Sequence, residues 1–314
     1  MKKSLPLLII LVLLLILPLI GLSTYALHIS VLVIMWSVIG MGWNILGGYC
    51  GQVSFGHAAF FGMGAYTAGL LYFHLGISAW WGLLACIPVL TVTSLVIGYI
   101  CLRLRGAYFA LATLALGEVL RVTAENLVKF TQGDLGILIK QRTWVEKTWF
   151  YYIILLVAIG TFILVKKVIE SKLGYYFVAI REDQDAAESM GIDTTLYKTI
   201  ALCLSGTLTG MAGAFYMNYM GYIDPTVVFP LYDISIVTVM VVMIGGVATY
   251  WGPAIGAVIM VFLAEVIRSM PKIGAAHQTL FGILLIFIII FLPNGIAGDY
   301  RKLLRPFRPK GASS

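Results

Sequence analysis

Long uninterrupted apolar runs recur along this 314-residue sequence and restrict the folds open to it. Many reach about 18 residues, which is long enough for a helix to cross a hydrocarbon layer of roughly 30 Å. They are continuous rather than alternating, which excludes a strand barrel. Only 11% of the residues are charged, against about 25% in a soluble chain. The sequence therefore predicts an all-α polytopic membrane protein, with residues 1–314 forming a single transmembrane domain.

Ten spans are expected from these runs. The first follows Lys2 and Lys3, and it is longer than the apolar part of a signal peptide and has no A-x-A cleavage site after it. If both termini are cytoplasmic, 14 Lys and Arg lie inside and 7 outside, as the positive-inside rule requires, although the expected outer segment 123–148 holds four of them. The inner group includes the short basic C-terminal tail, 294–314. The expected spans are 5–22, 27–46, 56–74, 80–102, 107–122, 149–165, 199–219, 232–247, 253–268 and 277–293.

Two glycine clusters interrupt the apolar runs. Nine glycines fall between Gly40 and Gly69, and a second group lies between Gly245 and Gly256. Glycines let helix backbones approach closely, and paired Gly/Pro interruptions in two halves are typical of transporters built from a repeat. Both ordinary close packing and a discontinuous-helix repeat explain the clusters at this stage.

Four polar residues accompany the first cluster, namely Asn44, Gln52, Ser54 and His57. Polar side chains at membrane depth are costly against lipid, so they are expected to face protein or a water-filled path. They either line a translocation path or fix the packing of neighbouring helices. For His57 alone we favour packing.

Several functions lose support because their motifs are absent. The sequence has no G-x-x-x-x-G-K-[ST], H-E-x-x-H or G-x-S-x-G, so no ATPase or catalytic site is predicted on this chain. We expect no metal or other cofactor to be bound by it, and we interpret its four cysteines as small buried apolar residues. The basic residues gather beside membrane spans, which explains the net charge of +7 without nucleic acid. Two carboxylates late in apolar runs, Glu118 and Glu265, are expected to pair with Arg121 and Arg268 one helical turn later.

The segment 166–198 contrasts with the rest, because it holds eleven of the 35 charged residues. Within it, residues 181–191 predict one short helix with acids in its first turns and Gly191 at its C-terminal end. Ala186, Ala187 and Met190 would form a small apolar patch ringed by charge. Such a helix either lies in a groove of another protein or packs on its own chain.

The order Asp185-Ala186-Ala187, three residues, then Gly191 resembles the E-A-A-x-x-x-G cytoplasmic loop of ABC-importer permeases, with Asp in place of Glu. In that family the loop is the coupling helix that docks on the ATP-binding subunit. The resemblance implies coupling roles for these four residues, with Arg181 and Glu188 as flanking contacts. It also predicts that Ala187→Trp abolishes uptake while the protein still inserts.

Longer motifs resemble one particular family among these permeases. The segments 44–66, 105–118, 179–191, 210–216 and 245–257 are similar, in order, to branched-chain amino acid permeases of the LivM type. That family implies a pore subunit of a prokaryotic plasma-membrane importer that works by alternating access. The implied partners are a second related permease, two ABC ATPase subunits that bind ATP, and a periplasmic or lipid-anchored substrate-binding protein. The implied substrates are leucine, isoleucine and valine, or other amino acids, amides or urea.

Two other classes stay open on the residues alone. A self-contained secondary transporter driven by an ion gradient would need ion-binding groups within its spans, and Glu118 and Glu265 are the candidates. An intramembrane enzyme would need a catalytic constellation, which the sequence lacks. The charged segment therefore favours a chain that receives energy from a partner.

Overall fold

The computed structural model describes residues 12–21, 23–139, 147–268 and a few positions between 279 and 298. Its regular elements are almost all helical. Two two-residue strands, β1 (Ile137–Leu138) and β2 (Tyr222–Ile223), pair antiparallel with Ile137 opposite Ile223. The helices of six or more residues are α2 (Thr24–Trp43), α3 (His57–Leu75), α4 (Gly82–Cys101), α5 (Ala107–Asn126), α7 (Lys147–Ile169), α8 (Lys172–Glu182), α9 (Gln184–Ser189), α10 (Thr194–Met220), α12 (Val237–Gly245) and α13 (Gly252–Arg268), and the short helices are α6 (Val128–Thr131) and α11 (Pro225–Val228).

Two of the helices carry a π-helical turn at one end. Residues Asn44–Tyr49 extend α2 as a π-helix, and residues Leu231–Ile236 lead into α12 in the same way. Short π-helical segments inside longer helices often occur at functional sites. The first segment lies within the first glycine cluster, and the second contains Asp233.

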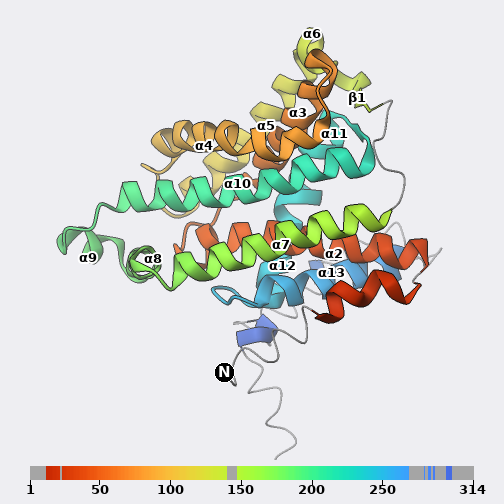
Figure 1. Ribbon diagram of the computed structural model, residues 1–314. Helices are drawn as coiled ribbons and strands as arrows, with labels where there is room; N and C mark the ends of the chain where they lie inside the picture. Colours follow the sequence, from red (N-terminus) through yellow and green to blue (C-terminus); the bar gives the residue numbers. More distant parts are fainter. Residues whose placement is uncertain are drawn as a thin grey trace, which may run out of the picture.

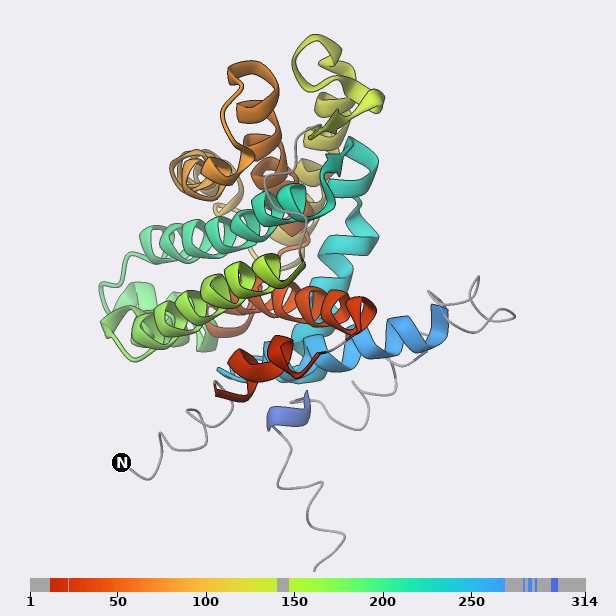
Figure 2. The ribbon, with the colours of Figure 1, turned by 45° about the vertical axis from the view of Figure 1, so that its right-hand side comes forward.

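The helices form layers in which α2 and α10 lie at the centre (Figures 1 and 2). In their most apolar 18-residue windows, 72% of the α2 span and 67% of the α10 span is buried, against 28% or less for α4, α5 and α7. The outer helices direct large apolar side chains outward, such as Leu84, Val96 and Leu156. In a membrane protein such faces contact lipid, so α4, α5 and α7 form the periphery.

Glycines bring the central helices into close contact. A Cβ added to Gly64 of α3 would lie 1.9 Å from the carbonyl oxygen of Gly210 in α10, and one added to Gly213 would lie 1.9 Å from that of Phe61. The second cluster packs α12 on α13 in the same manner, because a Cβ on Gly256 would lie 1.8 Å from the Val241 oxygen. Close packing therefore accounts for both clusters, while the internal repeat stays a prediction.

Ten spans are not confirmed. Six helices in the described chain are long and apolar enough to cross a membrane, and they match six expected spans. Two further expected spans, 56–74 and 253–268, are also helical but fall short of the length or hydropathy of a membrane span. Helix α13 is too short, and the glycines and histidines of α3 lower its hydropathy. The first expected span is described only in part, and the tenth, 277–293, lies almost wholly outside the described residues. The six are Thr24–Tyr49, Ala79–Cys101, Ala107–Asn126, Lys147–Ile169, Thr194–Met220 and Pro225–Gly245.

Candidate functional site

The charged segment forms two helices rather than the single helix expected over 181–191. Helix α8 ends at Glu182, and α9 begins at Gln184. Asp183 separates them because its carboxylate accepts hydrogen bonds from the backbone N–H groups of Asp185 and Ala186, at 2.9 and 3.0 Å. This is an N-cap, which satisfies donors left free at the start of a helix. Arg181 therefore belongs to α8, while Gly191, with φ of +82°, follows α9 as expected.

The two alanines of α9 face in opposite directions. Ala187 is buried against its own chain and is only 4% exposed, whereas Ala186 and Met190 are exposed, Met190 by 83%. A bulky side chain at Ala187 would therefore disturb the fold of this segment itself. Replacing Ala187 cannot separate docking from folding, and Ala186 is the position at which size tests the outer face.

A basic residue that the sequence analysis did not assign to this site holds α9 in place. Arg105, in the turn between α4 and α5, donates to the Asp185 carboxylate at 2.7 Å and lies 3.6 Å from that of Glu188. Hydrogen bonds from Gln184 and Thr194, with a smaller contribution from the Arg105 charge, lower the pKa of Glu188. Arg105 stands within a family motif and was predicted to be cytoplasmic, but its pairing 80 residues along the chain could not be read from the sequence.

Arg181 connects this segment to the first glycine cluster. Its guanidinium donates to the carbonyl oxygen of Gly48 at 3.3 Å and also pairs with Glu182. A Cβ added to Gly51, where φ is +72°, would lie 2.7 Å from the Arg181 side chain. The α8 helix therefore rests directly on the end of α2, and glycine is required at this contact.

Asn44 joins the two glycine clusters. Its side-chain oxygen accepts from the backbone N–H of Ala248 at 2.9 Å, and its amide nitrogen donates to the Thr249 oxygen at 2.9 Å. Asn44 is 1% exposed, so both bonds are made away from solvent. They tie the end of α2 to the turn between α12 and α13, which fits the packing alternative for this residue.

The other three predicted path residues lie in or beside the irregular stretch between Tyr49 and α3. Ser54 is fully buried; its hydroxyl accepts from the Gly56 N–H, and its carbonyl accepts from the Trp43 indole. His57 is also buried, with its Nε2 2.7 Å from the Ser205 hydroxyl. Gln52 is half-buried and makes a long 3.4 Å bond to the Cys50 oxygen. A role for these residues in a translocation path stays a prediction.

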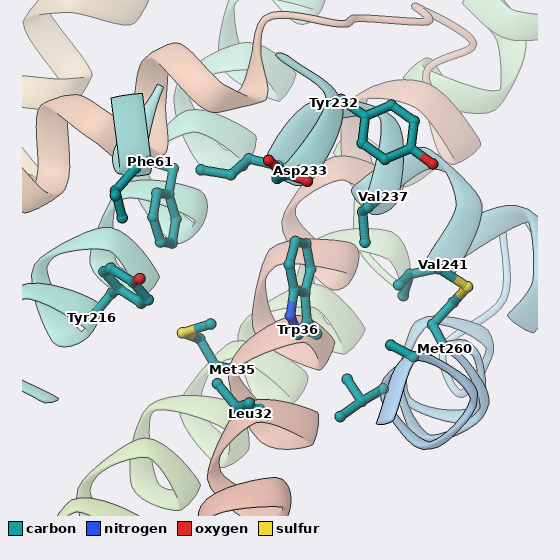
Figure 3. Close-up of a pocket in the computed structure, with 14 residues that line it drawn as sticks. Leu32, Met35, Trp36, Phe61, Tyr216, Tyr232, Asp233, Val237, Val241 and Met260 are labelled. Atoms are coloured by element: carbon teal, nitrogen blue, oxygen red, sulfur yellow. The ribbon is translucent and has the colours of Figure 1, made fainter. Parts of the chain in front are cut away.

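A cavity of about 430 Å³ lies elsewhere, between α2, α3 and α10 on one side and α12 and α13 on the other (Figure 3). Asp233 is the single charged residue among the fourteen that line it. This carboxylate was not among the predicted site residues. It stands inside the expected span 232–247, and a lone acid in an apolar run is the signal that could have identified it.

The carboxylates that the sequence analysis did single out have partners outside this cavity. Glu118 pairs with Arg121 as expected, and Arg121 also pairs with Glu125. Glu265 accepts a hydrogen bond from the Tyr25 hydroxyl, while the side chain of Arg268 lies outside the described residues. Within the described ranges, no group of His, Cys, Asp or Glu could hold a metal ion.

These features define an all-α, multi-pass membrane protein with a charged helical segment at one end and a cavity among its central helices. The profile of the family described as the branched-chain amino acid transport system permease component matches residues 25–289. The chain belongs to this family.

Its relatives indicate which type of permease within this family the chain represents. It is 26% identical to the high-affinity branched-chain amino acid transport system permease protein LivM of Salmonella typhimurium, over 90% of this chain and 72% of the relative. The LivM protein of Escherichia coli K12 is also 26% identical, with 88% and 71% covered. A probable LivH permease of Methanocaldococcus jannaschii is 27% identical, over 70% of this chain and 68% of its own. The chain is thus an ABC permease of the LivM type, a transport subunit rather than an enzyme, as predicted.

Proposed function

We propose that this chain is the membrane-spanning subunit of an ATP-driven importer for branched-chain or related amino acids in a prokaryotic plasma membrane, with both termini cytoplasmic. It pairs with a second, LivH-like permease, and the relatives named LivM and LivH support this pairing. Two ABC ATPase subunits bind and hydrolyse ATP, and a periplasmic or lipid-anchored binding protein delivers the substrate. Alternating access of the cavity to the two sides then moves the substrate.

The exposed face of α9 carries this proposal. Ala186 and, just after the helix, Met190 are exposed. Asp185 is exposed too but pairs with Arg105, and α9 begins at the Asp183 cap. An apolar patch beside acidic groups suits a groove on a partner protein. Figure 1 shows α8 and α9 at one end of the molecule, beyond the spans. This end is the proposed docking site for the ATPase.

Two contacts supply a route from this docking site to the spans. Arg105 links α9 to the start of α5, and Arg181 links α8 to Gly48 at the end of α2. Asn44 then joins that end of α2 to the turn before α13. A displacement of α8 and α9 by the ATPases would therefore act on three helices through direct hydrogen bonds.

Co-purification tests the docking site. In Ala186→Trp, the indole should prevent the ATPase subunits from co-purifying and should abolish ATP-driven leucine uptake, while the permease pair still inserts. The matched control is Leu135→Trp, which adds the same ring at another exposed position, 78% exposed, outside this segment. Normal ATPase association in Ala186→Trp contradicts the assignment.

A secondary transporter is the second candidate, and Asp233 is the observation that favours it. A carboxylate inside a span is a common element of proton- or ion-coupled transport. Vesicles with an ion gradient but no ATP distinguish the two classes. Uptake under those conditions supports the second candidate, and uptake that requires ATP supports the first.

A further inference from the structure

Asp233 occupies an unusual position for a carboxylate. It lies in the π-helical segment after Pro230, near the midpoint of the span Pro225–Gly245. It forms no ion pair with any Lys or Arg of the described residues. A charge at membrane depth is expensive unless it faces a cavity or finds a counter-charge. Asp233 lines the cavity and is itself exposed, so a cationic ligand in the cavity would supply the missing counter-charge.

The rest of the cavity is suited to an aliphatic group. Figure 3 shows Phe61 and Tyr216 on one side and Val241 and Met260 on the other, with Trp36 and Asp233 between them. The volume of about 430 Å³ falls within the roughly 300–1,000 Å³ typical of small-ligand sites. The aromatic rings add cation–π attraction for an ammonium group. One anionic group on an otherwise apolar and aromatic wall matches a small aliphatic ammonium compound.

The cavity also has the location of a transport site. Trp36 and Met260 lie near the middle of the apolar helices Thr24–Tyr49 and Gly252–Ile267, as Asp233 does in its own span. The span that carries Asp233 is broken at Phe229 and Pro230, between α11 and the π-helical segment. Substrate sites of transporters typically lie near the midplane beside such discontinuous helices.

We propose that this cavity binds the transported amino acid during passage, with Asp233 holding its α-ammonium group and the surrounding apolar wall holding its branched side chain. This inference rests on the proposed function for its substrate class. Asp233 selects amino acids over the corresponding carboxylic acids, because only an amino acid brings an ammonium group that offsets the repulsion between its own carboxylate and Asp233.

Binding to the assembled permease–ATPase complex in nanodiscs, without the binding protein, tests the site. The probes are radiolabelled leucine and two competitors, isoamylamine, which lacks the carboxylate, and 4-methylpentanoate, which lacks the ammonium group. In the wild type, isoamylamine should displace leucine and 4-methylpentanoate should not. Asp233→Asn should weaken leucine binding by about 10- to 100-fold, the loss expected for one charge-assisted hydrogen bond.

Three further variants distinguish a loss of the binding site from a loss of folding. Asp233→Glu keeps the charge and should retain most of the binding. Val237→Trp keeps the carboxylate but fills the cavity beside it, and should abolish binding of both leucine and isoamylamine. Asp134→Asn makes the same chemical change at an exposed position outside the cavity, and should bind leucine like the wild type. Co-purification of the partner subunits reports assembly for each variant.

The outcomes separate this site from the proposed function. Equal leucine binding and ATP-driven uptake in wild type and Asp233→Asn overturn the site and keep the function. Asp233-dependent binding of isoamylamine, without ATP-driven uptake of leucine, isoleucine or valine by the wild type, keeps an ammonium site and overturns the function. A wild-type complex that binds neither leucine nor isoamylamine overturns the site.

Discussion

Replacing Gly64 by alanine tests whether the α3–α10 contact sets the stability of the membrane core. The new Cβ would lie 1.9 Å from the Gly210 oxygen and 2.6 Å from the Gly210 Cα. Both atoms are backbone, so no side-chain rotation relieves the clash and the two helices must separate. Overpacking of this kind lowers the free energy of unfolding by about 1–3 kcal/mol. The better helix propensity of alanine offsets up to about 1 kcal/mol of that loss.

Gly160→Ala is the matched control for this substitution. Gly160 lies in the middle of α7, and a Cβ added there meets nothing within 4 Å. It therefore gains the helix propensity of alanine without any clash, so the two variants should differ in stability by roughly 1–3 kcal/mol. The assay is the thermal midpoint of the permease pair in detergent, followed by the fraction that stays monodisperse.

The expected order is Gly160→Ala at or slightly above the wild type, and Gly64→Ala clearly below it. Leucine uptake should fall with Gly64→Ala as well, because α3 and α10 carry Phe61 and Tyr216 into the cavity. Equal midpoints for the two alanine variants would refute the claim that close backbone contact at Gly64 decides this packing.

The remaining predictions concern the contacts at the end of the molecule that holds α9. Arg105→Ala should leave stability within about 1 kcal/mol, since exposed ion pairs contribute little, but it should lower the leucine transported per ATP hydrolysed. Exchanging the charges in Arg105→Asp with Asp185→Arg should restore part of that ratio. Asn44→Ala should cost about 1–3 kcal/mol in denaturant unfolding, because it leaves two half-buried backbone groups unpaired; an unchanged midpoint would contradict this. The lowered pKa of Glu188 means that its bonds hold above its ordinary value of 4.5 and are lost as pH falls through the lowered value. The protection of the backbone amides over 184–189, taken relative to an unfolded peptide at the same pH, should therefore fall only in acid, and in Glu188→Gln that fall should disappear.

The sequence predicted the fold class and most of the spans because a membrane helix can be recognised from its own residues, without knowledge of the rest of the fold. Each span must pair its backbone internally and present about 20 apolar residues to lipid, so its length and hydropathy are written in one continuous segment. Helices with mixed surroundings were harder to interpret. Helix α3 is lined with glycine and carries His57 because protein, not lipid, surrounds it.

At the candidate docking site, the sequence could reveal the motif but not its orientation. The order from Asp185 to Gly191 identified the segment by resemblance, but the single helix expected over 181–191 is divided at Asp183, which caps α9. Which alanine faces outward depends on what packs beneath α9. That neighbour comes from elsewhere in the fold, so the sequence could not show that Ala187 is buried while Ala186 is exposed.

What the sequence determined by itself was therefore local: a polytopic helical chain, its glycine-rich breaks, and a charged segment between two spans. What only the tertiary structure decided was which distant groups meet. Arg105 reaches Asp185, Asn44 reaches the turn before α13, and Asp233 lines a cavity formed by six helices and the segment that carries it. The hydropathy of a segment indicates whether lipid or water surrounds it. Contacts between residues that are about 80 to 200 positions apart in the sequence depend instead on how the folded helices pack.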